Sequence, residues 1–138
     1  MIELTNILET SLYVDDLDAA RNFYGEILGL KEYSFAEGRN VFYQLENSML
    51  LVFNPEATRD QDIGIGNAKI PTHGATGNGH MAFTISSDQI EKIKQELTEH
   101  GVEVESHVVW NNNAQSIYVR DPAGNCVEFA TADLWYGN

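Results

Sequence analysis

Apolar and polar residues alternate with a period of two over residues 7–14, which predicts a half-buried β-strand. The period then changes to that of a helix, which Asp15 or Asp16 can cap and Gly29 can end. The apolar face of this helix consists of Leu17, Ala20, Phe23, Tyr24 and Ile27. Three strand-like runs follow, at residues 31–36, 40–45 and 48–54. The first part of the chain therefore has the predicted order β-α-β-β-β.

The same order returns in the second half of the chain. A strand pattern over residues 80–85 precedes a helix that starts with a capping box at Ser86 and Gln89 and ends at Gly101. Further strand-like runs lie at residues 102–110, 115–120 and 126–131, and residues 121–125 have the Pro and Gly positions of a tight turn. A weak internal repeat of this kind predicts an α+β fold of two βαβββ modules.

The length of the chain, 138 residues, suits a single domain that contains both modules. We expect module 1 at about residues 5–54, module 2 at about residues 80–131 and a C-terminal tail at residues 132–138. The connector, residues 55–79, is rich in glycine and has little apolar periodicity. A connection of this length is usually either a linker or a functional loop. The pattern favours a linker, and the functional loop remains the alternative.

Strand parity selects three candidate metal ligands. Side chains two residues apart share one face of a sheet. In the first strand of each module, and in the last strand of module 2, one face is bulky and apolar and suits a covering helix. The opposite face is smaller and more polar, and it carries Glu9, His80 or Glu128.

A comparison of the two modules strengthens this selection. Glu9 and His80 hold the same position, and matching the aromatic residues of the later strands pairs Glu128 with Val52. A pseudo-twofold fold would gather the four positions at its centre. Three protein ligands with one open position are the pattern of a catalytic metal site. The ordinary alternative to a metal ligand, for each residue taken singly, is an exposed strand glutamate or a hydrogen-bonded core histidine.

The charge of the chain excludes several classes of partner. Eight Lys and Arg residues stand against 21 Asp and Glu residues, for a net charge of −13, and no basic cluster is visible. We therefore expect no nucleic-acid partner and no anionic membrane partner, and long-range attraction only for cations. The sequence shows no signal peptide and no long apolar run, which predicts a cytoplasmic protein.

Several short motifs are shared with a known family. They are LETSLYVDDL at residues 8–17, Phe23-Tyr24 with Leu-Gly-Leu at residues 28–30, GHMAF at residues 79–83 and DPAGNCVEF at residues 121–129. In these motifs the chain resembles the vicinal oxygen chelate superfamily, which includes glyoxalases, bleomycin-resistance proteins and extradiol dioxygenases. The resemblance implies two modules whose mixed sheet curls around a metal-binding cup, a small-molecule substrate and a homodimer.

The resemblance also implies a ligand set, position by position. The first-strand ligand of the family, usually a histidine, corresponds to Glu9; the ligand that opens the second module corresponds to His80, and the final-strand ligand to Glu128. Glyoxalase I relatives add a glutamate where this chain has Val52. That departure argues against a standard glyoxalase I. Two carboxylates and one imidazole suit Mn²⁺, Fe²⁺ or Zn²⁺.

Three further residues are candidates for proton transfer and substrate binding. His73 can serve as a base if the connector folds over the cup, and otherwise it is an exposed loop histidine. Tyr118 and Arg120 face the cup by strand parity; Arg120 could bind a substrate anion or pair with a surface carboxylate. The predicted function is a metal-dependent lyase, isomerase or dioxygenase acting on a small oxygenated metabolite. The alternative is a metal-free, drug-binding protein like those of bleomycin resistance.

Overall fold

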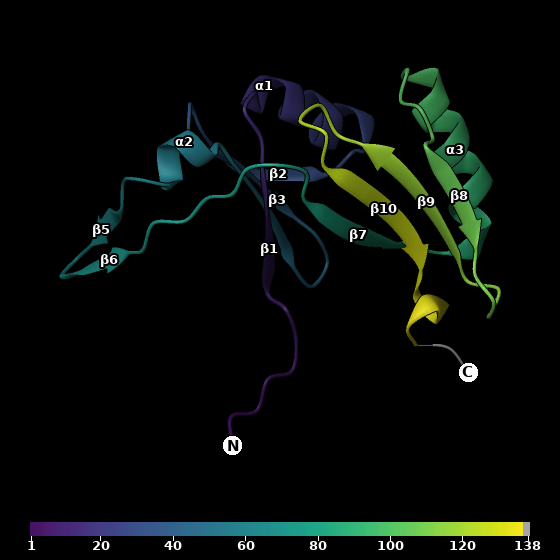
Figure 1. The fold of residues 1–138 in the computed structure, drawn as a ribbon, viewed down its shortest axis with the longest axis horizontal. Helices are drawn as coiled ribbons and strands as arrows, with labels where there is room; N and C mark the ends of the chain where they lie inside the picture. Colours follow the sequence, from purple (N-terminus) through teal and green to yellow (C-terminus); the bar gives the residue numbers. More distant parts are fainter. Residues whose placement is uncertain (137–138) are drawn as a thin grey trace. The chain divides into compact units, whose positions relative to one another are not determined.

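In a computed structural model, which describes residues 1–136, the chain divides into two compact units (Figure 1). They are Met1–Gly77 and Asn78–Asn138. Each unit holds one four-stranded mixed sheet and one main helical segment. The element order in each unit confirms the predicted α+β fold with two βαβββ modules.

The first unit contains a sheet with the strand order β1-β4-β3-β2. Its strands are β1 (Glu9–Tyr13), β2 (Lys31–Ala36), β3 (Asn40–Gln44) and β4 (Met49–Phe53). Strands β1 and β4 run parallel, and the other pairs are antiparallel. The helix begins as α1 (Leu17–Ala20) and continues as a π-helix, η1 (Arg21–Ile27). The Asp16 side chain accepts from the Ala19 amide and caps it, as the sequence predicts.

The second unit repeats this topology with the strand order β7-β10-β9-β8. Its strands are β7 (His80–Ile85), β8 (Ser106–Val109), β9 (Gln115–Arg120) and β10 (Cys126–Thr131). A short 3₁₀ turn, η2 (Ser87–Gln89), leads into α3 (Ile90–Glu99), and η3 (Ala132–Leu134) follows β10. The predicted capping box is present at Ser86. Figure 1 shows α3 along the sheet of this unit.

One predicted strand is wrong over its first half. The pattern predicts a strand over residues 102–110, but β8 begins only at Ser106. The amide of Val102 instead donates to the Leu97 carbonyl at 2.8 Å, and Gly101 adopts a φ of 76°. These residues therefore close the end of α3, since a left-handed glycine followed by an amide that bonds back to the last turn is a standard helix end.

The connector contains secondary structure that its sequence does not predict. It starts with α2 (Pro55–Thr58), capped by Asn54, and contains a small hairpin of β5 (Ile63–Ile65) and β6 (Ala68–Ile70). Each strand of the hairpin is only three residues long and its side chains are mostly exposed, which is too short a pattern to identify a strand from the sequence. The linker prediction is therefore incomplete, because α2 and the hairpin are ordered elements.

The sheet faces follow the predicted parity. Leu12 and Val14 in the first unit, and Phe83 and Ile85 in the second, are buried, while His80 and Glu9 on the opposite faces are exposed. Within residues 1–136, no helix has both the length and the apolar character needed to cross a membrane.

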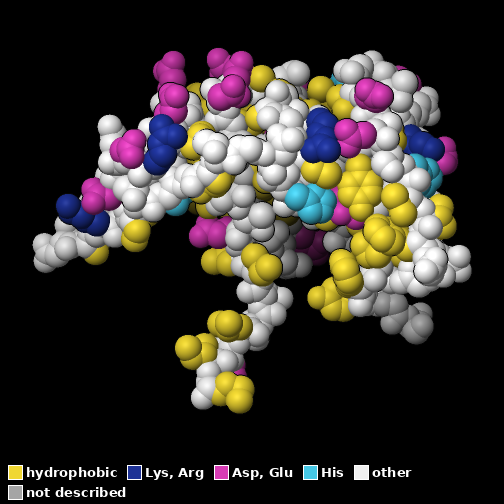
Figure 2. All heavy atoms as spheres, viewed as in Figure 1, with side chains coloured by type: hydrophobic (Ala, Val, Ile, Leu, Met, Phe, Trp, Pro, Cys, Tyr) yellow, Lys and Arg dark blue, Asp and Glu magenta, His cyan; other side chains and the backbone are white. Residues whose placement is uncertain are grey.

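Residues 1–8 precede the first strand and carry exposed apolar side chains. Ile2, Leu4, Ile7 and Leu8 are between 74% and 89% exposed, and the segment is visible below β1 in Figure 2. The Leu8 carbonyl still accepts from the Met49 amide at 2.9 Å. Leu8 therefore lies at the margin of the sheet, although strand parity predicts it on the buried face.

The strand register corrects one match between the modules. Glu9 pairs with the first residue of β4, and His80 pairs with the first residue of β10, so these two positions are equivalent. Two residues further along, Ser11 pairs with Leu51 where Ala82 pairs with Glu128. The equivalent of Glu128 is thus Leu51, and the predicted match with Val52 is off by one residue.

Candidate functional site

The second unit brings together His80 and Glu128. The two residues lie on the neighbouring strands β7 and β10, and the distance from His80 Nε2 to Glu128 Oε1 is 3.3 Å. The Glu128 side chain is only 6% exposed, whereas the His80 side chain is 53% exposed. A buried carboxylate in a protein is normally paired with a cation or bound to a metal. This pair therefore has the burial and spacing of a functional site.

The orientation of the His80 ring is fixed by the backbone. Its Nδ1 lies 3.0 Å from the carbonyl oxygen of Cys126. Because a carbonyl can only accept, Nδ1 carries the proton in this contact. A ring with one proton presents the Nε2 lone pair to the Glu128 carboxylate, whereas a ring with two protons donates to it. Two acceptor atoms that face each other at 3.3 Å require either a proton or a metal cation between them.

Tyr118 lies beside this pair on β9. Its ring stacks on the His80 ring with 6.3 Å between centroids, and its backbone pairs with that of Glu128. Burial, followed by the charge of the Glu128 carboxylate, raises the pKa of Tyr118. The phenol consequently remains protonated at neutral pH and can donate a hydrogen bond.

The first unit brings His73 of the connector onto its sheet. His73 Nδ1 lies 2.7 Å from the Tyr13 hydroxyl, and its ring packs edge-on against Phe53 with 4.7 Å between centroids. Its amide donates to the Thr58 carbonyl, at the end of α2. His73 is therefore half-buried in the first unit and is not an exposed loop histidine.

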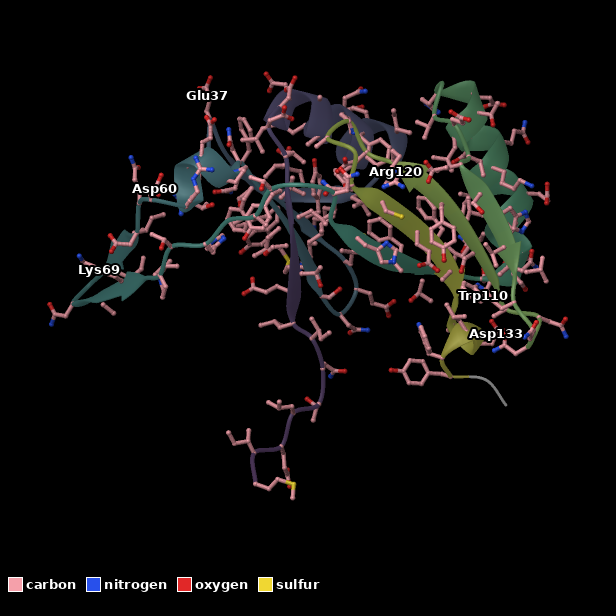
Figure 3. The ribbon with its side chains drawn as sticks, viewed as in Figure 1. Glu37, Asp60, Lys69, Trp110, Arg120 and Asp133 are labelled. Carbon is pink, nitrogen blue, oxygen red and sulfur yellow. The ribbon has the colours of Figure 1, made fainter. Side chains whose placement is uncertain are left out.

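Glu9 and Arg120 are both exposed. Glu9 opens β1 in the first unit. Arg120, labelled in Figure 3 at the end of β9, forms an ion pair with Glu105, 3.1 Å from Nη2 to Oε2, and donates to the Gly124 carbonyl. The structure thus shows the pairing of Arg120 with a surface carboxylate, which the sequence leaves as one of two alternatives.

The donor atoms of His80 and Glu128 fit a divalent metal. Two ligands that bind one ion through bonds of about 2.1 Å lie about 3.0–3.4 Å apart at octahedral or tetrahedral angles. The observed spacing of 3.3 Å falls in this range. Among residues 1–136, no group of three or more His, Cys, Asp and Glu side chains is arranged for metal binding. The structure thus brings His80 and Glu128 into contact, and the assignment of Glu9, His80 and Glu128 as metal ligands remains a prediction.

Two residues beside the site are missing from the sequence-based selection. Ser116 donates to Glu128 Oε2 at 2.6 Å, and Trp110, labelled in Figure 3 just after β8, donates to the Ser116 hydroxyl. Strand parity places Ser116 on the same face of β9 as Tyr118, which is a signal that could have found it. The position of Trp110 depends on the β8–β9 turn and has no comparable signal.

Comparisons with known proteins agree with the fold. The family model of the Glyoxalase/Bleomycin resistance protein/Dioxygenase superfamily matches residues 6–129. A crystal structure of lactoylglutathione lyase from Agrobacterium tumefaciens is 38% identical, with a TM-score of 0.87, over 96% of this chain and 97% of that chain. A glyoxalase family protein from Bacillus anthracis, 21% identical with a TM-score of 0.70, covers 95% of this chain and 98% of its own and shows the shared fold.

A curated protein is also similar. Virulence protein STM3117 of Salmonella typhimurium is 27% identical over 128 residues, which is 86% of this chain and 78% of that protein. The match to the family model extends over most of the chain. The chain therefore belongs to the glyoxalase/bleomycin resistance/dioxygenase superfamily, the vicinal oxygen chelate superfamily.

Proposed function

We propose that this chain is a divalent-metal-dependent enzyme that acts on a small oxygenated metabolite, with Glu9, His80 and Glu128 as ligands of Mn²⁺, Fe²⁺ or Zn²⁺. The observation that carries the proposal is the buried Glu128 carboxylate, 3.3 Å from the Nε2 atom of His80. The family supports it, because metal dependence is common among its members. The cup that would bring Glu9 to the other two ligands is part of the proposal.

Lyase or isomerase chemistry is the favoured reaction class. The likeness to the lactoylglutathione lyase, at 38% identity over nearly the whole chain, supports it. Leu51, the register equivalent of Glu128, is apolar, as is Val52, so this chain lacks the fourth-strand glutamate expected of a standard glyoxalase I. We therefore propose a related reaction, or the same reaction with a smaller ligand set. Dioxygenase chemistry is the less favoured class.

The residues around the proposed site have separable roles. When bound, the divalent ion would supply Lewis acidity toward substrate oxygens. Glu9 and Glu128 would balance its charge. Tyr118, whose pKa is raised by burial, would donate a hydrogen bond to a substrate oxygen and remain protonated at neutral pH.

His73 is the proposed proton carrier. Burial raises the pKa of Tyr13, so its hydroxyl keeps its proton and can donate to Nδ1 of His73 at 2.7 Å. When Nδ1 of His73 accepts from Tyr13, the ring carries its own proton on Nε2 and can donate a hydrogen bond to a substrate oxygen. To serve as the base predicted from the sequence, His73 would have to accept the substrate proton at Nδ1, in place of the Tyr13 hydroxyl.

Metal-free drug binding is the second candidate function. The net charge of −13 would attract a cationic drug, and the superfamily includes bleomycin-resistance proteins. In this case His80 and Glu128 would form an ordinary ion pair, with a proton in place of the metal.

Lactoylglutathione lyase activity, measured before and after chelation, tests the proposal. Purified protein treated with a chelator should lose activity and regain it on addition of Mn²⁺, Fe²⁺ or Zn²⁺. His80→Ala should not regain it. His107→Ala is the matched control, because His107 is an exposed histidine on β8 that contacts Lys94 and Gln115. Saturable binding of a cationic drug that is indifferent to the chelator, without metal-restored activity, would favour the second candidate.

A further inference from the structure

A chain of hydrogen bonds leads from the surface of the second unit to Glu128. The Trp110 indole donates to the Ser116 hydroxyl at 2.9 Å, and that hydroxyl donates to Glu128 Oε2 at 2.6 Å. Trp110 is 38% exposed, whereas Ser116 is fully buried and Glu128 is 5% exposed. The most buried residues in this series of hydrogen bonds are therefore Ser116 and Glu128.

The direction of each hydrogen bond follows from the donor inventory. An indole N–H can only donate, so the Ser116 oxygen must accept from Trp110. A serine has one hydroxyl proton, and Glu128 Oε2 receives it. Because Ser116 is fully buried, water cannot replace either partner. The Tyr118 hydroxyl also lies within hydrogen-bond reach of Ser116 and Glu128, so the bond from Ser116 to Glu128 is part of a small network around the carboxylate.

The two oxygens of the Glu128 carboxylate therefore have different partners. Oε2 of Glu128 is bound to Ser116, while Oε1 faces His80 Nε2 at 3.3 Å. Rotation of the carboxylate about its last bond would break the short bond to Ser116. A ligand carboxylate whose second oxygen is held in this way would offer a metal its other oxygen alone. Partners of this kind commonly change metal affinity by about 10–100-fold when they are removed.

We propose that Ser116, oriented by Trp110, is a positioning residue that presents Glu128 to the metal through Oε1 alone. The inference rests on the proposed metal site, and it assigns a role to two residues that neither bind the metal nor touch the substrate. On this account the β8–β9 turn, which carries Trp110, controls the coordination mode of a ligand on β10.

Titration of the metal-free protein with Co²⁺ tests this role, because the visible spectrum of Co²⁺ reports its coordination geometry. Ser116→Ala should bind Co²⁺ about 10–100-fold more weakly than the wild type. Its visible bands should also change, because the freed Oε2 can join the coordination. Ser106→Ala, an exposed serine on the neighbouring strand β8, should match the wild type in affinity and spectrum.

Trp110→Phe provides a second variant in case the buried Ser116→Ala does not fold. It keeps an aromatic ring at a partly exposed position, removes the N–H donor and makes the side chain smaller. We expect weaker Co²⁺ binding than in the wild type and an altered spectrum, with a smaller change than for Ser116→Ala. Circular dichroism should show native secondary structure in both variants used for the comparison.

The outcomes separate this inference from the proposed function. If the wild type binds no Co²⁺, the metal site itself is wrong. If the wild type binds Co²⁺ and both Ser116→Ala and Trp110→Phe match it in affinity and spectrum, the positioning role is wrong and the metal site stands. Weaker binding with altered bands in Ser116→Ala and Trp110→Phe, beside an unchanged Ser106→Ala, supports the positioning role.

Discussion

The same substitution, tyrosine to phenylalanine, should have opposite effects on stability at two positions of the first unit. The Tyr43 hydroxyl is buried, and it has no hydrogen-bond partner among residues 1–136. The Tyr13 hydroxyl, in contrast, lies 2.7 Å from His73 Nδ1. Tyr43→Phe removes a buried hydroxyl without a partner in the described part of the chain, which is unfavourable in the folded state. Tyr13→Phe breaks the hydrogen bond to His73.

The magnitudes follow from the energetics of buried polar groups. An unsatisfied buried hydroxyl costs about 1–3 kcal/mol, so Tyr43→Phe should raise the free energy of unfolding by about 1 kcal/mol. Loss of the hydrogen bond in Tyr13→Phe should lower it by about 1 kcal/mol. For a chain of this length, each change corresponds to a shift in Tm of about 3–5 °C, upward for Tyr43→Phe and downward for Tyr13→Phe.

Urea denaturation and thermal melts of the wild type and both variants measure these shifts. The wild type should lie between the two variants in both assays. If Tyr43→Phe is destabilised as much as Tyr13→Phe, the hydroxyl of Tyr43 has a partner, and the reasoning about its burial is refuted.

Three further predictions follow from the described contacts. Burial raises the pKa of Tyr43 from 10.0 to about 12, above the unfolded value, so the unfolded chain ionises first and the folded state loses stability between pH 10 and 12. Urea denaturation across this range should show a shallower decline in Tyr43→Phe. Glu128→Gln can still accept from Ser116 but loses the charge, so it should fold and bind Zn²⁺ at least about tenfold more weakly in calorimetry, and wild-type affinity would contradict this. We also expect light scattering to show a homodimer, to which the exposed apolar side chains of residues 1–8 contribute. The triple variant Ile2→Ser, Leu4→Ser, Ile7→Ser should have a lower dimer fraction, and an unchanged dimer fraction would exclude a role of residues 1–8 in dimerisation.

Much of the fold could be predicted from the sequence because its strands and helices have clear periods. The predicted strands at residues 31–36, 80–85, 115–120 and 126–131 match the observed bounds. The caps at Asp16 and Ser86 were also predictable, since a capping side chain bonds to an amide two or three residues away. Local signals of this kind need no knowledge of the tertiary structure.

The register between strands could not be predicted in the same way. Similarity of side chains suggests that Tyr43 is the equivalent of Tyr118. In the structure the equivalent is Phe42, because Phe42 pairs with Leu51 in the first unit as Tyr118 pairs with Glu128 in the second. Pairing between strands depends on hydrogen bonds across the sheet, and a slip of one residue moves a side chain to the other face. The predicted equivalence with Val52 failed for this reason.

The contact between His80 and Glu128 could be predicted from the sequence, whereas the hydrogen bonds that Ser116 and Trp110 make beside it could not. Residue type and strand parity selected His80 and Glu128, and the structure brings them within 3.3 Å of each other. Ser116 and Trp110 are common residue types whose importance comes from contacts across strands and turns. Hydrogen bonds of this kind appear only when the register and the turns are known.

The metal content of the purified protein shows whether the chain holds a metal ion through His80. Elemental analysis of the wild type and His80→Ala, each incubated with Mn²⁺, Fe²⁺ and Zn²⁺ and then freed of excess ion, gives the number of bound ions per chain. We expect about one ion per chain in the wild type and a large loss in His80→Ala, because the three proposed ligands would hold a single ion. Equal, near-zero metal in both proteins would contradict this expectation.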